Sequence, residues 1–289
     1  MKPKNFLKVL IFCASFSFVF TACQKEISQK KETANSVDEA SLKGISSFSS
    51  EEMNHIGLIL SSDLAKDVTT LDAASAGCSA VITYSPAPDV YPRTATIDWG
   101  TGCTNGGVTR SGKMHIYYTG NLSVLGSKSV TTYDNYYING IKFEGKLRFA
   151  NNGELEGDKI VYRLTYKDKK TIQENGDYIN INGHARVIKK TGGAGFPGFP
   201  DGNFRETTGA EGYPLTYTYS TGGVITQYIL NITSPLIYNE GCAWITRGVS
   251  QYTYGDGSIG LLDYGTGDCD DQATYTRYGI TTPITLTPH

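Results

Sequence analysis

Hydrophobic and polar residues alternate along most of the chain from residue 78 onward, with the period of two that is typical of β-strands. The segment INGIKFEGKLRF places apolar side chains at every second position and mostly charged side chains between them, and the segments KIVYRLTYK and YININGHARV alternate in the same way. The side chains expected to point inward are Ile141, Phe143, Leu147, Phe149, Ile160, Tyr162, Leu164, Tyr166, Ile179, Ile181, Ala185 and Val187. Such alternation favours antiparallel sheets with one face in the core and the other in water.

Glycines interrupt these alternating segments at Gly112, Gly145, Gly183 and Gly248. A glycine inside a strand often marks a bulge, a bend or a close approach of another backbone. The glycines are irregularly spaced, which indicates a meander of similar hairpins rather than a solenoid. We therefore expect a mainly β fold over residues 78–289, built from antiparallel meander sheets that form a sandwich or an open, barrel-like structure.

One short N-terminal helix is expected before the β domain, in a helical segment spanning residues 49–77. Its sequence SSEEMNHIGLILSSDLAKDV opens with a capping box, in which Ser49 and Glu52 bond each other's backbone amides. Apolar residues then recur at helical spacing, at Met53, Ile56, Leu60 and Leu64. We expect this stripe to pack against the β domain.

The segment between Thr191 and Gly212 is rich in glycine and proline, so neither a strand nor a helix is expected there. Residues 191–212 are then either a connection between two β halves or a loop folded over a site. The phenylalanines Phe196, Phe199 and Phe204 would contact a ligand in the second case and pack on the sheet otherwise.

The N-terminus has the pattern of a secretory signal peptide over residues 1–22. Three lysines flank a short apolar run from Val9 to Phe20, which is shorter than the ~20 residues that a membrane-spanning helix needs. The run ends in FTAC, which resembles the lipobox of bacterial lipoproteins and predicts acylation of Cys23. The alternative is a secreted protein in which Cys23 is incidental. Residues 23–48 are polar and lack a sustained apolar period, so we expect a flexible tether.

These features predict a protein of the cell envelope that is held by its N-terminal lipid to the outer membrane. Whether the protein faces the periplasm or the cell surface stays open. The chain has 26 basic and 28 acidic residues, and loss of the three leader lysines leaves 23 against 28, a net charge near −5. This balance disfavours a nucleic-acid partner, which would require a basic stripe.

The sequence carries no recognisable catalytic motif: no G-x-S-x-G, H-E-x-x-H or P-loop is present. The histidines His55, His115, His184 and His289 are scattered, and we expect no metal ion or cofactor. His115 and His184 fall on the outward faces of their strands, beside Lys113 and Arg186. Three carboxylates could supply a glycosidase pair, but nothing distinguishes any two of them: Glu144, Glu154 and Glu156.

Two functions from different classes follow. The first is a non-enzymatic binding or structural protein whose sheet face is the working surface, where Tyr117, Tyr136 and Tyr219, if outward, would stack on a glycan or peptide. The second is a hydrolase acting on cell-surface glycan, or an accessory carbohydrate-binding protein.

Four cysteines remain once Cys13 leaves with the leader and Cys23 carries lipid, and they are expected to form disulfides in an oxidising compartment. Two similar units select one pairing among three. Each unit runs from a cysteine through a strand and a turn to Asp-aromatic-Gly-Thr-Gly and a second cysteine. Like units should close alike, which gives the disulfides Cys78–Cys103 and Cys242–Cys269.

The repeated motif, DWGTGC at residues 98–103 and DYGTGDC at residues 263–269, allows two interpretations. Calcium could bind the acidic residues of the second copy, Asp263, Asp268, Asp270 and Asp271, with Asp256 nearby. The first copy has only Asp98, so a shared role cannot depend on a carboxylate cluster. We therefore expect two braced turns, in which an aspartate accepts backbone amides and glycines adopt positive φ.

The succession of lipobox, tether, capped helix and these motifs resembles a family of uncharacterised lipoproteins of Bacteroidota. The resemblance rests on G-x-x-R-x-G, at Gly107, Arg110 and Gly112, and on the closing residues Asp263 to Asp270. It implies an envelope location and a β architecture but no activity.

Overall fold

The computed structural model describes residues 70–72, 79–105, 108–156, 159–191, 203–209, 214–238, 242 and 244–286. These residues all belong to one compact unit, residues 45–289. The predicted signal peptide, the tether and most of the predicted helical segment 49–77 lie outside the described residues, as do Cys23 and His55.

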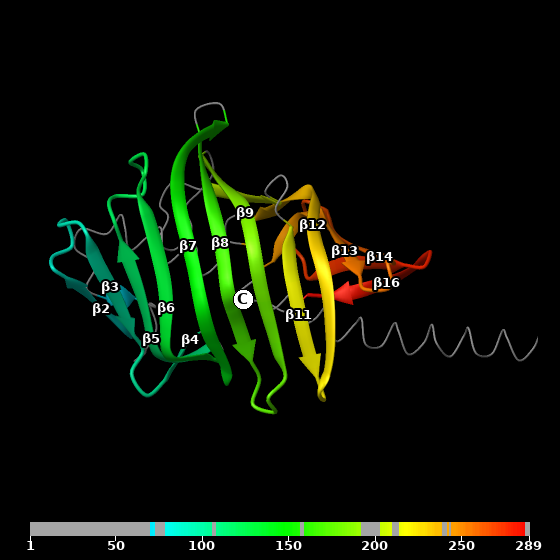
Figure 1. Cartoon of the computed structure of the whole chain (residues 1–289), viewed down its shortest axis with the longest axis horizontal. Coiled ribbons are helices and arrows are strands. Elements are labelled where there is room, and N and C mark those ends of the chain that lie inside the picture. The colour runs from blue at the N-terminus through cyan, green and yellow to red at the C-terminus, as the bar shows by residue number, and fades with distance from the viewer. Residues whose placement is uncertain are drawn as a thin grey trace, which may run out of the picture. The chain divides into compact units, whose positions relative to one another are not determined.

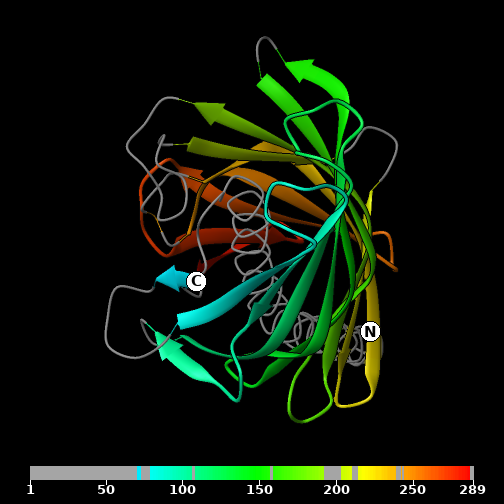
Figure 2. The same cartoon turned by 90° about the vertical axis from the view of Figure 1, so that its left-hand side faces the viewer.

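The described residues form one large antiparallel sheet, which confirms the predicted mainly β, meandering fold (Figure 1). The sheet curls along its length (Figure 2) but does not close, since β1 and β16 at its two ends each pair with a single neighbour among the described strands. The strands are β1 (Thr70–Asp72), β2 (Ser79–Ser85), β3 (Arg93–Asp98), β4 (Cys103–Asn105), β5 (Val108–Tyr118), β6 (Lys128–Ile138), β7 (Ile141–Glu156), β8 (Lys159–Ile172), β9 (Tyr178–Thr191), β10 (Asn203–Gly209), β11 (Leu215–Thr221), β12 (Val224–Tyr238), β13 (Ile245–Tyr254), β14 (Ile259–Thr266), β15 (Gln272–Arg277) and β16 (Ile280–Thr285).

Two segments that were not predicted to form strands each contain one, so both assignments are wrong at those residues. The end of the predicted helical segment forms β1, which pairs with β2. The predicted irregular segment 191–212 contains β10, which pairs with both β9 and β12. In each case the pairing partners lie elsewhere in the sequence, so tertiary contacts override the local composition.

The predicted inward side chains form the core of the sheet. Phe143, Leu147 and Phe149 are at most 3% exposed, and the inward residues of β8 and β9 are also buried, except that Ile160, like Ile141 of β7, is half-buried. Full burial of a large apolar side chain stabilises the fold by about 1.5–3 kcal/mol. Burial of these side chains therefore stabilises the central strands.

Glycines bend the sheet at bulges, as predicted. Gly112, Gly145, Gly183 and Gly248 all have positive φ, and a Cβ atom on Gly145 would lie 2.0 Å from the carbonyl oxygen of Asp168 on β8. Pairing shifts register at this point, between Glu144 and Lys146. A bulge adds one residue to a strand and increases its local bend. The four glycines therefore allow neighbouring backbones to approach where the sheet curves.

Candidate ligand-binding face

The outer face of the central strands collects basic side chains around Thr165 of β8. Thr165 alternates with the buried residues Leu164 and Tyr166, so its side chain lies on the outer face. Arg148 of β7 is directly opposite on one side, and His184 of β9 is directly opposite on the other.

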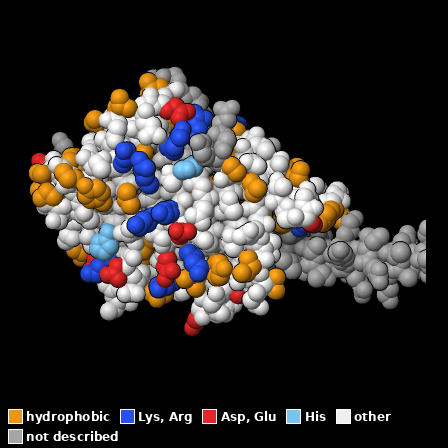
Figure 3. Space-filling model, in the orientation of Figure 1, with side chains coloured by type: hydrophobic (Ala, Val, Ile, Leu, Met, Phe, Trp, Pro, Cys, Tyr) orange, Lys and Arg blue, Asp and Glu red, His pale blue; other side chains and the backbone are white. Residues whose placement is uncertain are grey.

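The same face carries further cations one step along the strands. Arg163 and Lys167 lie two residues before and after Thr165, a separation of about 7 Å on the same face. Lys146 is directly opposite Lys167, and Arg186 is directly opposite Arg163. We call this set the basic cluster: Lys146, Arg148, Arg163, Lys167, His184 and Arg186. Figure 3 shows Lys and Arg side chains gathered over the central strands on this side of the molecule.

The basic cluster is poorly neutralised. Among its lysines and arginines, only Arg186 forms an ion pair with a described residue, Glu154. The Nε atoms of Arg163 and Arg186 are buried and form no hydrogen bond. Like charges directly opposite each other on paired strands are destabilising. The cluster therefore concentrates positive charge at a cost to the sheet.

Two other cations on the outer face, Lys113 and Lys142, are paired with carboxylates. The Lys113 ammonium lies 2.9 Å from a carboxylate oxygen of Asp98, and that of Lys142 lies 2.8 Å from Glu144. These hydrogen bonds to the carboxylates are the main reason that the pKa values of both lysines are raised. Arg148 and Lys167 of the basic cluster differ from these two lysines, because neither forms an ion pair with a described residue.

Two histidines are held by threonines on neighbouring strands. Thr165 Oγ1 lies 2.9 Å from His184 Nδ1, and Thr96 Oγ1 of β3 lies 3.0 Å from His115 Nδ1 of β5. Both histidines lie on the outer face, as predicted from the alternation, and both are half-buried. Within the described ranges, no three His, Cys, Asp or Glu side chains are grouped so that they could hold a metal ion.

The expected tyrosine surface is largely wrong. Tyr136 is fully buried and Tyr219 is 6% exposed, whereas Tyr117 is 43% exposed. Tyr136 points inward because the bulge opposite Gly112 shifts the alternation of β6, in which Ser129 and Thr131 are buried before the bulge. Tyr219 points inward because it pairs with the inward Ile179.

The candidate glycosidase carboxylates do not converge where they are described. Glu144 and Glu154 lie ten positions apart on β7, which corresponds to about 30 Å along a strand. Glycosidase carboxyl groups stand about 5–9.5 Å apart. Glu144 is bonded to Lys142 and Glu154 to Arg186, and the side chain of Glu156 lies outside the described residues.

The predicted disulfide Cys242–Cys269 is present, with 5.6 Å between its Cα atoms. Cys103 is also disulfide-bonded. Because Cys78 lies outside the described residues, the pairing Cys78–Cys103 stays a prediction.

The repeated motif forms the same turn twice. A carboxylate oxygen of Asp98 accepts the amide of Gly100 at 2.8 Å, and one of Asp263 accepts the amide of Gly265 at 2.9 Å. The glycines of both copies have positive φ: Gly100, Gly102, Gly265 and Gly267. Asp270 similarly accepts the amide of Gln272. These bonds are those expected of braced turns.

Three cations that the sequence did not single out are buried among aromatic rings: Arg93, Lys169 and Arg277. The Lys169 side chain is fully buried, and its ammonium lies 2.5 Å from the hydroxyl oxygen of Tyr133. The bulge at Asp168 reverses the alternation of β8 and turns this lysine into the core. The surrounding rings stabilise the ammonium by cation–π interaction.

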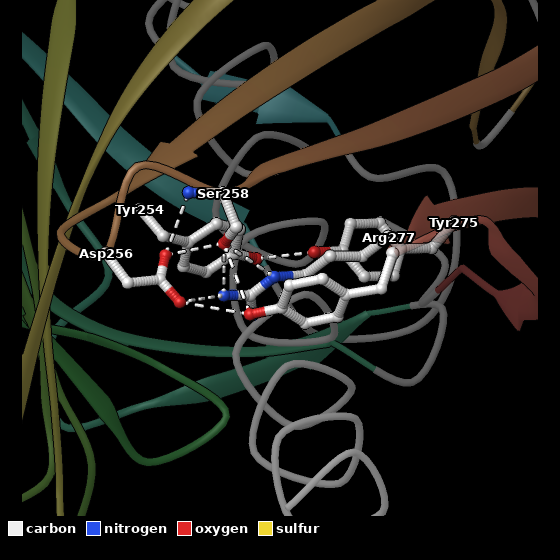
Figure 4. A network of polar contacts seen from close by, with 6 residues as sticks. Tyr254, Asp256, Ser258, Tyr275 and Arg277 are labelled. Atoms are coloured by element: carbon white, nitrogen blue, oxygen red, sulfur yellow. Dashed lines mark hydrogen bonds and ion pairs between the residues drawn. The ribbon is translucent and has the colours of Figure 1, made fainter. Parts of the chain in front are cut away.

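Arg277, the last residue of β15, is another of these buried cations (Figure 4). Its guanidinium carbon lies 3.5 Å from the Tyr254 ring centre and 4.7 Å from that of Tyr278, and Nη2 donates to Ser258 Oγ at 2.7 Å. Ser258 in turn donates to Asp256. This hydrogen bond is the main reason that the pKa of Asp256 falls to about 2. The network joins the turn between β13 and β14 to the end of β15, which is a structural role.

Comparison with known proteins gives no further information on the fold or the site. No family model, curated protein or solved structure matches the chain. No helix in the described part of the chain is long and apolar enough to cross a membrane.

The basic cluster could not be predicted from the sequence because its members come from three separate segments. Each segment shows only alternating charges, which are typical of any solvated strand face. The cluster emerges from the registers that set Arg148, Thr165 and His184 in one row. Strand registers of this kind cannot be derived from alternation alone.

Proposed function

We propose that the protein is a lipid-anchored protein of the cell envelope that binds a ligand without catalysing its turnover, and that the outer sheet face is its binding surface. The observation that carries this proposal is the basic cluster. Positive charges without counter-ions cost stability, and such departures from local consistency tend to mark functional sites. An anionic ligand would supply the missing charge.

The anchoring part of the proposal rests on the sequence. The lysine-flanked apolar run and the FTAC segment support processing before Cys23 and acylation of its sulfur. Each buried CH₂ of an acyl chain contributes about 0.8 kcal/mol, so two or more chains would anchor the protein stably. The resemblance to Bacteroidota lipoproteins supports the same location.

The non-enzymatic part is supported by the wide separation of Glu144 and Glu154 and by their ion pairs with basic neighbours. No observation favours the glycan hydrolase as a second candidate.

Cell fractionation tests the anchor. The wild-type protein should be recovered with membranes, and Cys23→Ser should be released in soluble form. Retention of this variant on membranes, or its continued labelling by a fatty-acid analogue, would contradict lipidation at Cys23.

Turnover assays on peptidoglycan and plant polysaccharides test the non-enzymatic role. The full chain should release no products from either substrate. Hydrolysis that disappears when a single carboxylate is replaced by its amide would establish an enzyme instead.

A further inference from the structure

We infer that the basic cluster is a binding site for an acidic polysaccharide, with one carboxylate or sulfate group seated over Thr165. This inference rests on the proposed function in one respect, the use of the outer sheet face as the binding surface. It adds the position of the site and the chemistry of its ligand.

The arrangement around Thr165 suits a single acidic group at its centre. Arg148 and His184 flank Thr165 across the two neighbouring strands, while Arg163 and Lys167 lie before and after it on β8. Directly opposite side chains on paired strands have Cβ atoms about 5 Å apart. An oxyanion above Thr165 would therefore lie within reach of basic side chains on four sides and of the threonine hydroxyl.

The arginines of the basic cluster add directional hydrogen bonding to its positive charge. The planar guanidinium group donates parallel hydrogen bonds to the two oxygens of a carboxylate or sulfate. Arg148 is exposed, and it forms no ion pair with any described residue. Its donors are available to a ligand that approaches the face.

The length of the cluster favours a chain of acidic groups over one small anion. From Lys146 on β7 to Arg186 on β9 the cluster crosses two strand spacings of about 4.8 Å and four residues of strand rise. This diagonal spans about 16 Å, estimated from ideal sheet geometry. A polymer with charges along its length would contact the whole diagonal, whereas a single ion would use only the centre.

The residues between the cations favour a glycan among the polyanions. The Thr165 hydroxyl and the side-chain NH₂ group of Asn182 offer hydrogen bonds that suit sugar hydroxyls. The described residues surrounding Thr165 on this face include no large apolar side chain that could insert into a membrane. The net charge of about −5 for the processed chain works against nucleic acid, for which attraction over a wide surface is the main source of affinity.

A binding assay tests this inference. The full chain, kept in nonionic detergent, is titrated with two acidic polymers, dextran sulfate and polygalacturonate, and with uncharged dextran as the control polymer. The double variant Arg148→Gln/Lys167→Gln removes two exposed charges of the cluster. The double variant Lys113→Gln/Arg247→Gln removes the same charges from β5 and β13 and serves as the matched control.

We expect wild type to bind at least one acidic polymer, with an affinity that falls as salt rises, and not to bind dextran. The Arg148→Gln/Lys167→Gln variant should bind at least tenfold more weakly, and the control variant should bind within twofold of wild type. Equal losses in the two variants, or no binding of either acidic polymer by wild type, would overturn the inference.

Two further probes separate the glycan from other anionic partners. Tighter binding to single-stranded DNA of equal charge would identify a nucleic-acid site, and tighter binding to vesicles containing phosphatidylglycerol would identify a membrane-facing surface. Either result overturns the polysaccharide assignment while leaving the binding role of the face intact. The prediction that Cys23 is lipidated is tested separately, by fractionation of the Cys23→Ser variant, because the binding assay does not depend on the lipid.

Discussion

Thr165 and His184 lie opposite each other on β8 and β9, with 2.9 Å between Thr165 Oγ1 and His184 Nδ1. Thr96 and His115 repeat this relationship on β3 and β5, and in both pairs the residues are 19 positions apart in sequence. The two pairs differ in their surroundings. Arg148 and Lys167, which form no ion pair with a described residue, adjoin the first pair, whereas the Lys113–Asp98 ion pair lies beside the second. The chain thus contains its own control for the proposed site.

Replacing each threonine with valine should separate stability from binding. Thr165→Val and Thr96→Val each remove one hydroxyl from a half-buried hydrogen bond, so each should lower the free energy of unfolding by about 0.5–1.5 kcal/mol. Only Thr165→Val should weaken binding of the acidic polysaccharide. Urea denaturation and binding measurements on both variants provide the test, and equal binding losses in the two would refute a site centred on Thr165.

Relief of repulsion within the basic cluster should stabilise the protein. Lys167 is directly opposite Lys146, so Lys167→Gln should raise the free energy of unfolding by a few tenths of a kcal/mol. Lys113→Gln breaks the ion pair with Asp98 and should leave stability unchanged or lower it slightly. The comparison is made by urea denaturation at low salt. A Lys167→Gln variant less stable than Lys113→Gln would show that the cluster carries no electrostatic cost.

The alternation of apolar and polar residues correctly predicts features of the fold that depend only on local strand geometry. Inward residues such as Leu147 and Ile181 follow from the period of two, and glycines such as Gly145 mark bulges because only they tolerate a neighbouring backbone so close. Tyr136 and Lys169 could not be placed in this way. A bulge in or beside their own strands shifts the alternation, and the sequence does not show which residue is the inserted one.

The basic cluster could not be predicted from the sequence, because its position depends on which distant segments pair. Arg148 and His184 meet at Thr165 through two strand registers that hairpins and bulges set together. Strand β10 was missed for a related reason. Its residues lie close to glycines and prolines, and its stability comes from pairing with β9 and β12 on its two sides.

Alanine at Gly145 should be far more costly than alanine at Gly140. Both glycines have similar positive φ, 87° and 81°, but a Cβ atom at Gly145 would collide with the Asp168 backbone, and one at Gly140 would meet nothing within 4 Å. Gly140→Ala should cost about 1–2 kcal/mol from backbone strain alone. Gly145→Ala should cost about 1–3 kcal/mol more from overpacking. Chemical denaturation of both variants measures the difference, and equal costs would argue against a bulge with close backbone contact.

Reduction and chelation should affect the closing turn differently. The Cys242–Cys269 disulfide closes a loop with a sequence separation of 27, which on the chain-entropy model stabilises the fold by roughly 3.5 kcal/mol. Reduction should therefore lower the melting temperature substantially, whereas EDTA should leave it unchanged. A clear drop with EDTA that calcium restores, and that Asp268→Asn/Asp270→Asn abolishes, would establish a calcium site in the second copy of the motif.

The structure of the full chain with a short sulfated oligosaccharide tests the central claim most directly. A sulfate group is expected over Thr165, within hydrogen-bond distance of its hydroxyl and of the Arg148 guanidinium, with the rest of the ligand running toward Lys146 or Arg186. An oligosaccharide bound elsewhere on the molecule while the basic cluster stays empty would contradict the account.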